Sequence, residues 1–178
     1  MIREAVIAAT VTAACAGPDA APVDAPPRDA PPPCDAQSLT IGRCVTDAGV
    51  ACTGALGEVR RFEAAAAGAE VPLVVGPQGS AMLVFAVATT GIVPGDPTDP
   101  TAATNPQLEL VVARGGAELA LYRGRMGFSD QGGQQVAAGL FAITEDTGLD
   151  GVALLAHAVL TDQAGAQRCG DWSFVARR

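Results

Sequence analysis

The chain has 178 residues, a net charge of −8 and no lysine, so its basic side chains are arginines and a single histidine. A chain this acidic lacks the basic patches that bind nucleic acid or anionic lipid headgroups, and we expect no nucleic-acid partner. Apolar residues make up 49% of it, which excludes a wholly disordered polypeptide and allows one domain with a sizeable core.

The first fifteen residues have the layout of an export signal. A polar start at Met1–Glu4 precedes an apolar run, Ala5–Val11, and then small residues before a cysteine. The run is too short for a transmembrane helix, which needs about 20 apolar residues. We therefore expect residues 1–14 to be a signal peptide and the protein to be exported.

The cysteine after this run belongs to a second motif. The segment Thr12-Ala13-Ala14-Cys15 resembles the lipobox of bacterial lipoproteins, in which small residues precede a cysteine that is acylated and becomes the mature N-terminus. It departs from that pattern at Thr12, where the family has a large aliphatic residue. The resemblance implies lipidation of Cys15 and a membrane partner reached through the lipid. It also implies a place in the cell envelope, either anchored in the outer membrane or periplasmic. An ordinary cleaved signal peptide, with no lipid on Cys15, remains the alternative.

Residues 15–33 are rich in alanine, aspartate and proline, as in Asp24-Ala25-Pro26-Pro27 and Asp29-Ala30-Pro31-Pro32. Proline-rich segments of this kind are extended and cannot form a core, so we interpret the stretch as a tether. Asp-Ala-Pro-Pro tethers behind a lipobox cysteine resemble those of myxobacterial-type surface lipoproteins. A proline-rich ligand for a recognition domain is the alternative interpretation.

Residues 34–57 form a cysteine-rich lead-in to the domain. If Cys15 carries lipid, four cysteines remain, and an exported chain with four cysteines predicts two disulfides. Asp47-Ala48-Gly49 is typical of a three-residue hairpin loop, which places Cys44 opposite Cys52. Cys34 then pairs with Cys169. None of the four has the spacing of a zinc site, so no metal is predicted there.

Residues 58–178 show a β pattern, with short apolar runs separated by glycine, proline and aspartate turns. Gly115-Gly116 is typical of a hairpin turn. About eight short strands predict an all-β, antiparallel sandwich, immunoglobulin-like or jelly-roll-like. The expected strands are 58–64, 71–75, 81–90, 107–113, 118–123, 139–144, 151–161 and 168–176.

Few residues suggest chemistry. His157 is the one histidine and the one candidate general base, yet no nucleophile motif accompanies it, and we expect a structural role. Two acidic loops offer candidate calcium ligands, although neither matches an EF-hand and acidic residues are ordinary in turns. Those candidates are Asp96, Asp99, Glu145, Asp146 and Asp150.

The function that follows is a non-enzymatic envelope or surface-displayed lipoprotein with a β-sandwich head. Its roles would be adhesion, structure or the binding of a protein or polysaccharide partner, with no catalytic residues and no cofactor. One alternative is a secreted hydrolase or carbohydrate-active enzyme that uses paired carboxylates in a cleft. Another is a periplasmic module that binds a small ligand or calcium.

Overall fold

A computed structural model describes residues 38–53, 58–76, 79–146 and 148–178. Contacts divide the chain into two units, Met1–Pro31 and Pro32–Arg178, and every described residue belongs to the second. The predicted signal peptide, the tether, Cys15 and Cys34 thus lie outside the described residues. Within these ranges no helix is long and apolar enough to span a membrane.

The described residues form ten strands and no helix, which confirms the all-β class. Alternating apolar residues and glycine-containing turns produce most of the strands, as the sequence pattern predicts. The strands are β1 (Leu39–Thr46), β2 (Arg60–Glu63), β3 (Ala69–Val75), β4 (Ala81–Thr89), β5 (Gln107–Arg114), β6 (Ala117–Arg125), β7 (Ser129–Gln131), β8 (Gln134–Thr144), β9 (Ala153–Thr161) and β10 (Gln167–Arg177).

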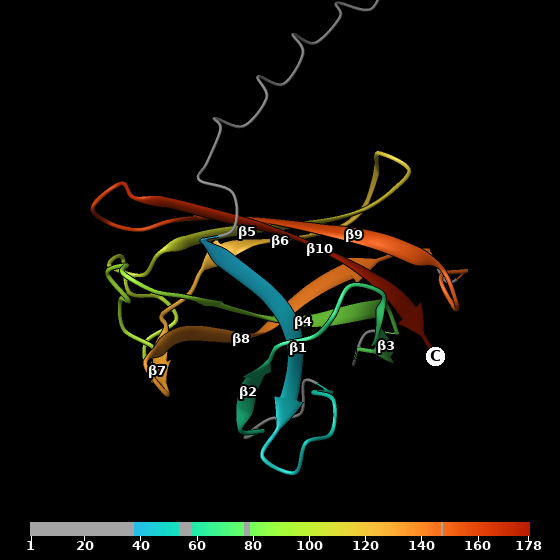
Figure 1. The fold of residues 1–178 in the computed structure, drawn as a ribbon, viewed down its shortest axis with the longest axis horizontal. Helices are drawn as coiled ribbons and strands as arrows, with labels where there is room; N and C mark the ends of the chain where they lie inside the picture. Colours follow the sequence, from blue (N-terminus) through green and yellow to red (C-terminus); the bar gives the residue numbers. More distant parts are fainter. Residues whose placement is uncertain (1–37, 54–57, 77–78, 147) are drawn as a thin grey trace, which may run out of the picture. The chain divides into compact units, whose positions relative to one another are not determined.

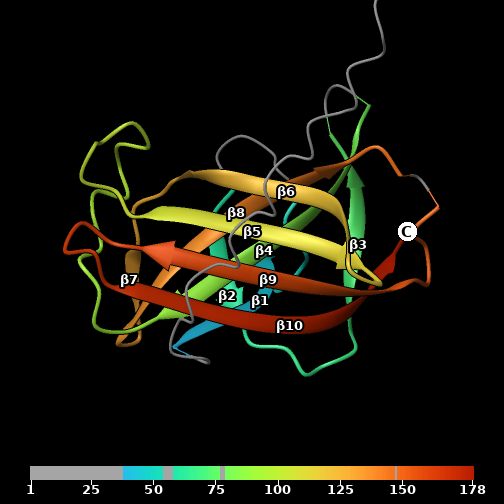
Figure 2. The same cartoon turned by 90° about the horizontal axis from the view of Figure 1, so that it is seen from above.

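Seven strands close into a barrel in the order β4-β3-β10-β9-β5-β6-β8 and back to β4. Figure 2 shows β6, β5, β9 and β10 lying side by side as one wall, and Figure 1 shows β4 and β8 on the opposite side. All pairings around the ring are antiparallel except that of β3 with β10. β3 and β1 pair with the same edge of β4. The pairing with β3 reaches Leu83, and β1 pairs with Phe85 to Thr89.

The predicted two-sheet sandwich of about eight strands is not confirmed. The β4–β8 and β3–β10 pairings join the two walls into a ring, whereas a sandwich would leave its sheets separate. The two strands that the sequence pattern missed are β1 and β7. β1 falls inside the predicted lead-in, and β7 is a polar tripeptide that lacks apolar alternation.

The interior of the barrel is filled by side chains. Phe85 on β4 meets the rings of Trp172 and Phe174 edge to face, at centroid distances of 6.2 and 5.3 Å. The indole Nε1 of Trp172 donates a hydrogen bond to the Ala66 carbonyl at 3.1 Å, so the polar end of this buried ring is satisfied. These aromatic residues make the barrel a packed core.

A second apolar cluster lies outside the barrel wall, because β4 is buried on both faces. Its odd-numbered residues point into the barrel, while Val84 and Ala86 point outward against Cys44 and Cys52. The half-buried rings of Phe62 and Phe141 complete this outer cluster. The run of apolar residues in β4 therefore reflects burial between the barrel core and the strands that cover its outer face.

Candidate functional site

The most distinctive local structure outside the barrel is the 44–52 hairpin, defined as residues 44–52 at the end of β1. The Thr46 amide donates to the Val50 carbonyl at 2.7 Å, and Gly49 takes a φ of 73°. Cys44 and Cys52 form a disulfide across it, with Cα atoms 5.4 Å apart. This confirms the predicted Cys44–Cys52 pairing and its three-residue loop.

The disulfide is almost completely buried, with Cys44 2% and Cys52 1% exposed. It packs on the outer face of β4, so it fixes the hairpin to the barrel wall as well as closing its own loop. The tip is exposed, and Val50 is 61% accessible. The result is a firmly held base below an exposed apolar tip.

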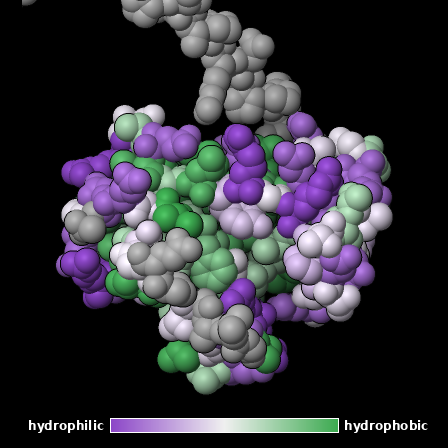
Figure 3. Space-filling model, turned by 180° about the vertical axis from the view of Figure 1, so that it is seen from behind, coloured by the Kyte–Doolittle hydropathy of each residue, from purple (hydrophilic) through white to green (hydrophobic). Residues whose placement is uncertain are grey.

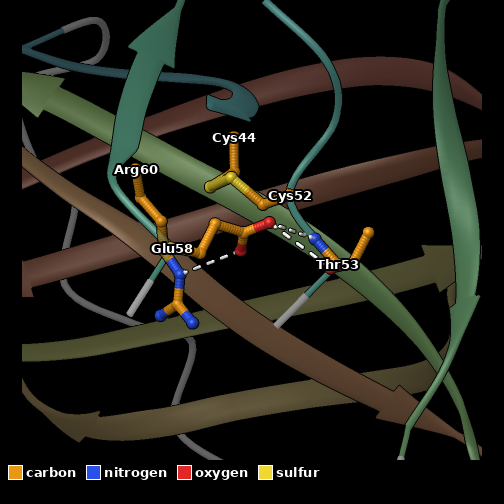
Figure 4. Close-up of a disulfide and its surroundings, with 5 residues drawn as sticks. All are labelled: Cys44, Cys52, Thr53, Glu58 and Arg60. Atoms are coloured by element: carbon orange, nitrogen blue, oxygen red, sulfur yellow. Dashed lines mark hydrogen bonds and ion pairs between the residues drawn. A yellow bond between two sulfur atoms is a disulfide. The ribbon is translucent and has the colours of Figure 1, made fainter. Parts of the chain in front are cut away.

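A buried carboxylate supports the chain after the disulfide, as Figure 4 shows. Glu58 Oε1 accepts hydrogen bonds from the Thr53 amide and hydroxyl at 3.0 and 3.3 Å. Glu58 Oε2 accepts one from Arg60 Nε at 3.3 Å. The Glu58 side chain is only 9% exposed, so these bonds offset the cost of burying its charge.

Arg60 then lies across the outside of β8. Its guanidinium carbon is 5.0 Å from the centre of the Phe141 ring, a cation–π contact. A β-bulge makes room for it, because Gly139 is the extra residue between Leu140 and Ala138, which pair with successive residues of β4. A Cβ on Gly139 would collide with Nη1 of Arg60 and lie 2.8 Å from its Cδ.

Arg60 also borders a cavity of about 220 Å³, which we call the Arg60–Arg125 pocket. It lies between the end of β6, the start of β8 and the loop that follows β4. Gly127 allows this arrangement, because a Cβ there would overlap the backbone of Asp96 and Pro97. The lining residues are Arg60, Pro97, Pro100, Arg125, Met126, Gly127, Ser129, Gln131, Val136, Ala137 and Ala138.

Two other hollows are more polar. One lies beside the start of β1 and is lined by residues that include Thr40, Gln134 and Arg168. The other is lined by residues that include Gln107, Arg125 and Asp162. Among the described residues that line these three pockets, Asp162 is the single carboxylate, so these linings do not bring together the paired carboxylates that the hydrolase alternative requires.

The predicted candidate base, His157, is on β9 and faces outward. Its Nδ1 is 2.7 Å from Oδ1 of Asp171, the directly opposed residue on β10. Its other neighbour across the sheet is Val111 on β5. No described hydroxyl or thiol completes a nucleophile–base pair with it, and the Asp171 side chain is 65% exposed. The geometry is that of a surface cross-strand pair.

Three of the five calcium candidates, Asp96, Asp99 and Asp146, accept hydrogen bonds within their own turns. Oδ1 of Asp96 accepts from the amide and hydroxyl of Thr98, and the hydroxyl bond is the main reason the pKa of Asp96 is lowered. Asp99 bonds Thr101 in the same way. Asp146 accepts from the Gly148 amide at 2.7 Å and Asp150 from the Arg178 amide at 3.0 Å, while for Glu145 the structure records no such bond. Over the described ranges, no three of the His, Cys, Asp and Glu side chains gather as a metal would need.

One buried acid holds loops together at the end of the barrel. Asp162 is 7% exposed, and its Oδ2 accepts from the Val93 amide at 3.1 Å while Oδ1 accepts from the Ala166 amide at 2.9 Å. These bonds favour the carboxylate, and the one from Val93 contributes most to lowering the pKa of Asp162. Its role is to fasten the loop after β4 to the β9–β10 turn.

Hydrophobic residues also reach the surface of the barrel. Figure 3 shows them gathered across the middle of one face, between hydrophilic margins. Val59, Val75, Ile143 and Leu155 are among the large apolar side chains that are 47 to 67% exposed. Exposed apolar side chains are common on folded domains, so their exposure does not by itself define a site.

Sequence reasoning missed Glu58, Arg60, Arg125 and Asp171. Arg60 and Arg125 are 65 positions apart and line the same pocket only because β2 lies across the outside of β8. Asp171 could have been found from the expected pairing of the last two strands, which form a hairpin. Comparison of the chain with protein-family models and with curated proteins finds no match.

Proposed function

We propose that this chain is a non-enzymatic binding module displayed at the cell envelope, with the 44–52 hairpin as its contact element. The observation that carries this proposal is the contrast within the hairpin. Its base is locked by a buried disulfide and by the Glu58 hydrogen bonds, while its tip presents Val50 to solvent. A preorganised loop loses little conformational entropy on binding, so an exposed apolar tip on it can contribute affinity at low cost.

Figure 1 shows the ribbon of β1, β2 and this hairpin extending past the barrel, which gives the tip access to a large partner. An ion pair between Arg61 and Asp47 further fastens the tip to β2. The partner class that fits is a protein or a polysaccharide of the envelope, and the domain would be held near it by lipid on Cys15 and the tether of residues 15–33.

Co-sedimentation of the purified chain with isolated envelopes of the source cell tests the contact. We expect Val50→Asp to lower binding about tenfold, because a charge replaces the apolar contact. Val75→Asp is the matched control, since Val75 is 67% exposed against 61% for Val50, but lies at the end of β3. Equal binding by the wild type and Val50→Asp would contradict the proposal.

The anchor is tested separately by palmitate labelling in cells. We expect label on the wild type and none on Cys15→Ala, which should leave the membrane fraction. An unlabelled wild type would remove the lipoprotein part of the proposal and leave the binding test unaffected.

A further inference from the structure

The Arg60–Arg125 pocket combines features that point to a ligand. It is formed where β6 and β8 pair at a single position, Leu121 with Ile143, although both strands continue for several residues beyond it. The wall of the barrel therefore has a weak seam, and the cavity of about 220 Å³ lies along it.

The first feature is an arginine with unused donors. The Arg60 side chain is 27% exposed and makes one hydrogen bond, from Nε to Glu58. Its guanidinium is held against Phe141. Among the described residues, neither Nη1 nor Nη2 of Arg60 has a hydrogen-bond partner. A guanidinium held in place with open donors is prepared to bind an anion.

The second feature is another arginine, held by different contacts. Nη1 of Arg125 donates to the carbonyls of Ala103 and Asn105 at 3.2 and 2.9 Å. These bonds fix the guanidinium at the pocket, and within the described part of the chain its Nη2 has no partner. Two fixed guanidiniums thus border one small cavity.

The third feature is the remaining lining. Among the residues that the structure describes, no aspartate or glutamate lines the pocket, although the whole chain carries a net charge of −8. Glu58 offsets part of the charge of Arg60, but it accepts a hydrogen bond from Nε of Arg60 and leaves the two Nη nitrogens open. Pro97, Pro100 and Met126 supply apolar contacts.

We propose that this pocket binds a carboxylate attached to a short apolar group. The open Nη donors of Arg60 and Arg125 would hold the carboxylate, and Pro97, Pro100 and Met126 would cover the hydrocarbon. The volume is below the roughly 300–1,000 Å³ of sites for larger ligands, which favours a small group. The carboxylate belongs either to a free short-chain acid or to the C-terminus of a peptide. This site is distinct from the hairpin tip and does not depend on the function proposed above.

The test is an NMR titration of the full chain with butyrate, with its neutral isostere butyramide as the ligand control. We expect butyrate to shift the amide signals of Gly127, Ala137 and Ala138, and butyramide to bind about tenfold more weakly. Titrating to about 50 mM exceeds the millimolar Kd that so few contacts allow. No shifts at these amides, or equal binding of both probes, would overturn the proposal.

The matched variants are Arg125→Gln and Arg123→Gln. Arg123 lies on the same strand, pairs with Glu109 at 2.7 Å and does not line the pocket. We expect Arg125→Gln to weaken butyrate binding about tenfold and Arg123→Gln to leave it unchanged. Equal affinities for the two variants would contradict the site. An unchanged melting temperature for Arg125→Gln separates lost binding from lost folding.

A trialanine peptide with a free C-terminus, compared with its C-terminal amide, distinguishes the two sources of the carboxylate. Tighter binding of the free-acid peptide than of butyrate assigns the pocket to a chain terminus. Tighter binding of butyrate assigns it to a free acid, and both results support the carboxylate site.

Discussion

At the scale of single residues, glycine and charge placement decide how the outer face of the barrel is built. In β8, Ala137 points inward before Gly139, whereas Leu140 and Ala142 point inward after it. The bulge at Gly139 shifts the alternation by one residue and so keeps apolar side chains on the core side. Its positive φ of 87° and missing Cβ give Arg60 its place over Phe141.

We therefore predict that Gly139→Ala destabilises the domain by about 2 kcal/mol, through backbone strain and collision with Arg60. Gly133→Ala is the control, because Gly133 has a φ of 86° and nothing within 4 Å of a new Cβ. The measurement is urea unfolding. In an Arg60→Ala background the excess cost at Gly139 should disappear, and an excess that persists would show that Arg60 is not its cause.

A second residue-scale prediction concerns pH. The pKa of Asp162 is lowered in the folded state, chiefly by the Val93 amide. The stabilisation from this carboxylate is thus complete above its unfolded pKa of about 3.9, and is lost as the pH falls through the lower folded value. At neutral pH we expect the wild type to have a higher melting temperature than Asp162→Asn. The difference in melting temperature should shrink below about pH 4. A difference unchanged down to about pH 2 would show that the charge contributes nothing.

At the scale of elements, the 44–52 hairpin is the clearest case in which local sequence determined structure. Its disulfide closes a short loop, for which chain entropy predicts about 2–3 kcal/mol of stabilisation. We predict that the double variant Cys44→Ala/Cys52→Ala loses about that amount, with a further loss from the emptied space on β4. Val50→Ala, at the exposed tip, should change stability by less than about 0.5 kcal/mol.

Denaturant unfolding measures both changes, and amide exchange at Cys52, which donates to the Cys44 carbonyl at 3.0 Å, reports whether the hairpin persists. A double variant as stable as the wild type would mean that contacts on β4 alone hold the hairpin.

The sequence predicts elements whose signals are local and misses those that depend on distant partners. The hairpin at Gly115-Gly116 and the 44–52 loop follow from turn residues. Closure of the barrel does not, because the parallel pairing of β3 with β10 joins Ala69 to Phe174 across most of the domain. The Arg60–Arg125 pocket could not be predicted from the sequence either, since no residue spacing indicates that β2 crosses β8.

At the scale of the whole molecule, the beginning of the domain is tied to its end. β1 starts beside β10. The carbonyl oxygen of Leu39 lies so close to Gly170 that a Cβ there would overlap it. The preceding residue, Cys169, is on the outward-facing side of β10, yet it is only 5% exposed and is disulfide-bonded. Cys44 and Cys52 are bonded to each other. Cys34, the partner predicted from the sequence, lies outside the described residues.

We predict that the partner is Cys34. It precedes Leu39 by five residues, a span of at most about 17 Å, so it can reach Cys169 from the point where β1 meets β10. Such a bridge closes a loop of most of the domain and should stabilise it by about 4–5 kcal/mol in the chain-entropy estimate. Peptide mapping without reduction should yield a Cys34–Cys169 peptide. A Cys15–Cys169 peptide would contradict this pairing and also the lipidation of Cys15, because one thiol cannot both carry an acyl-glycerol and form a disulfide.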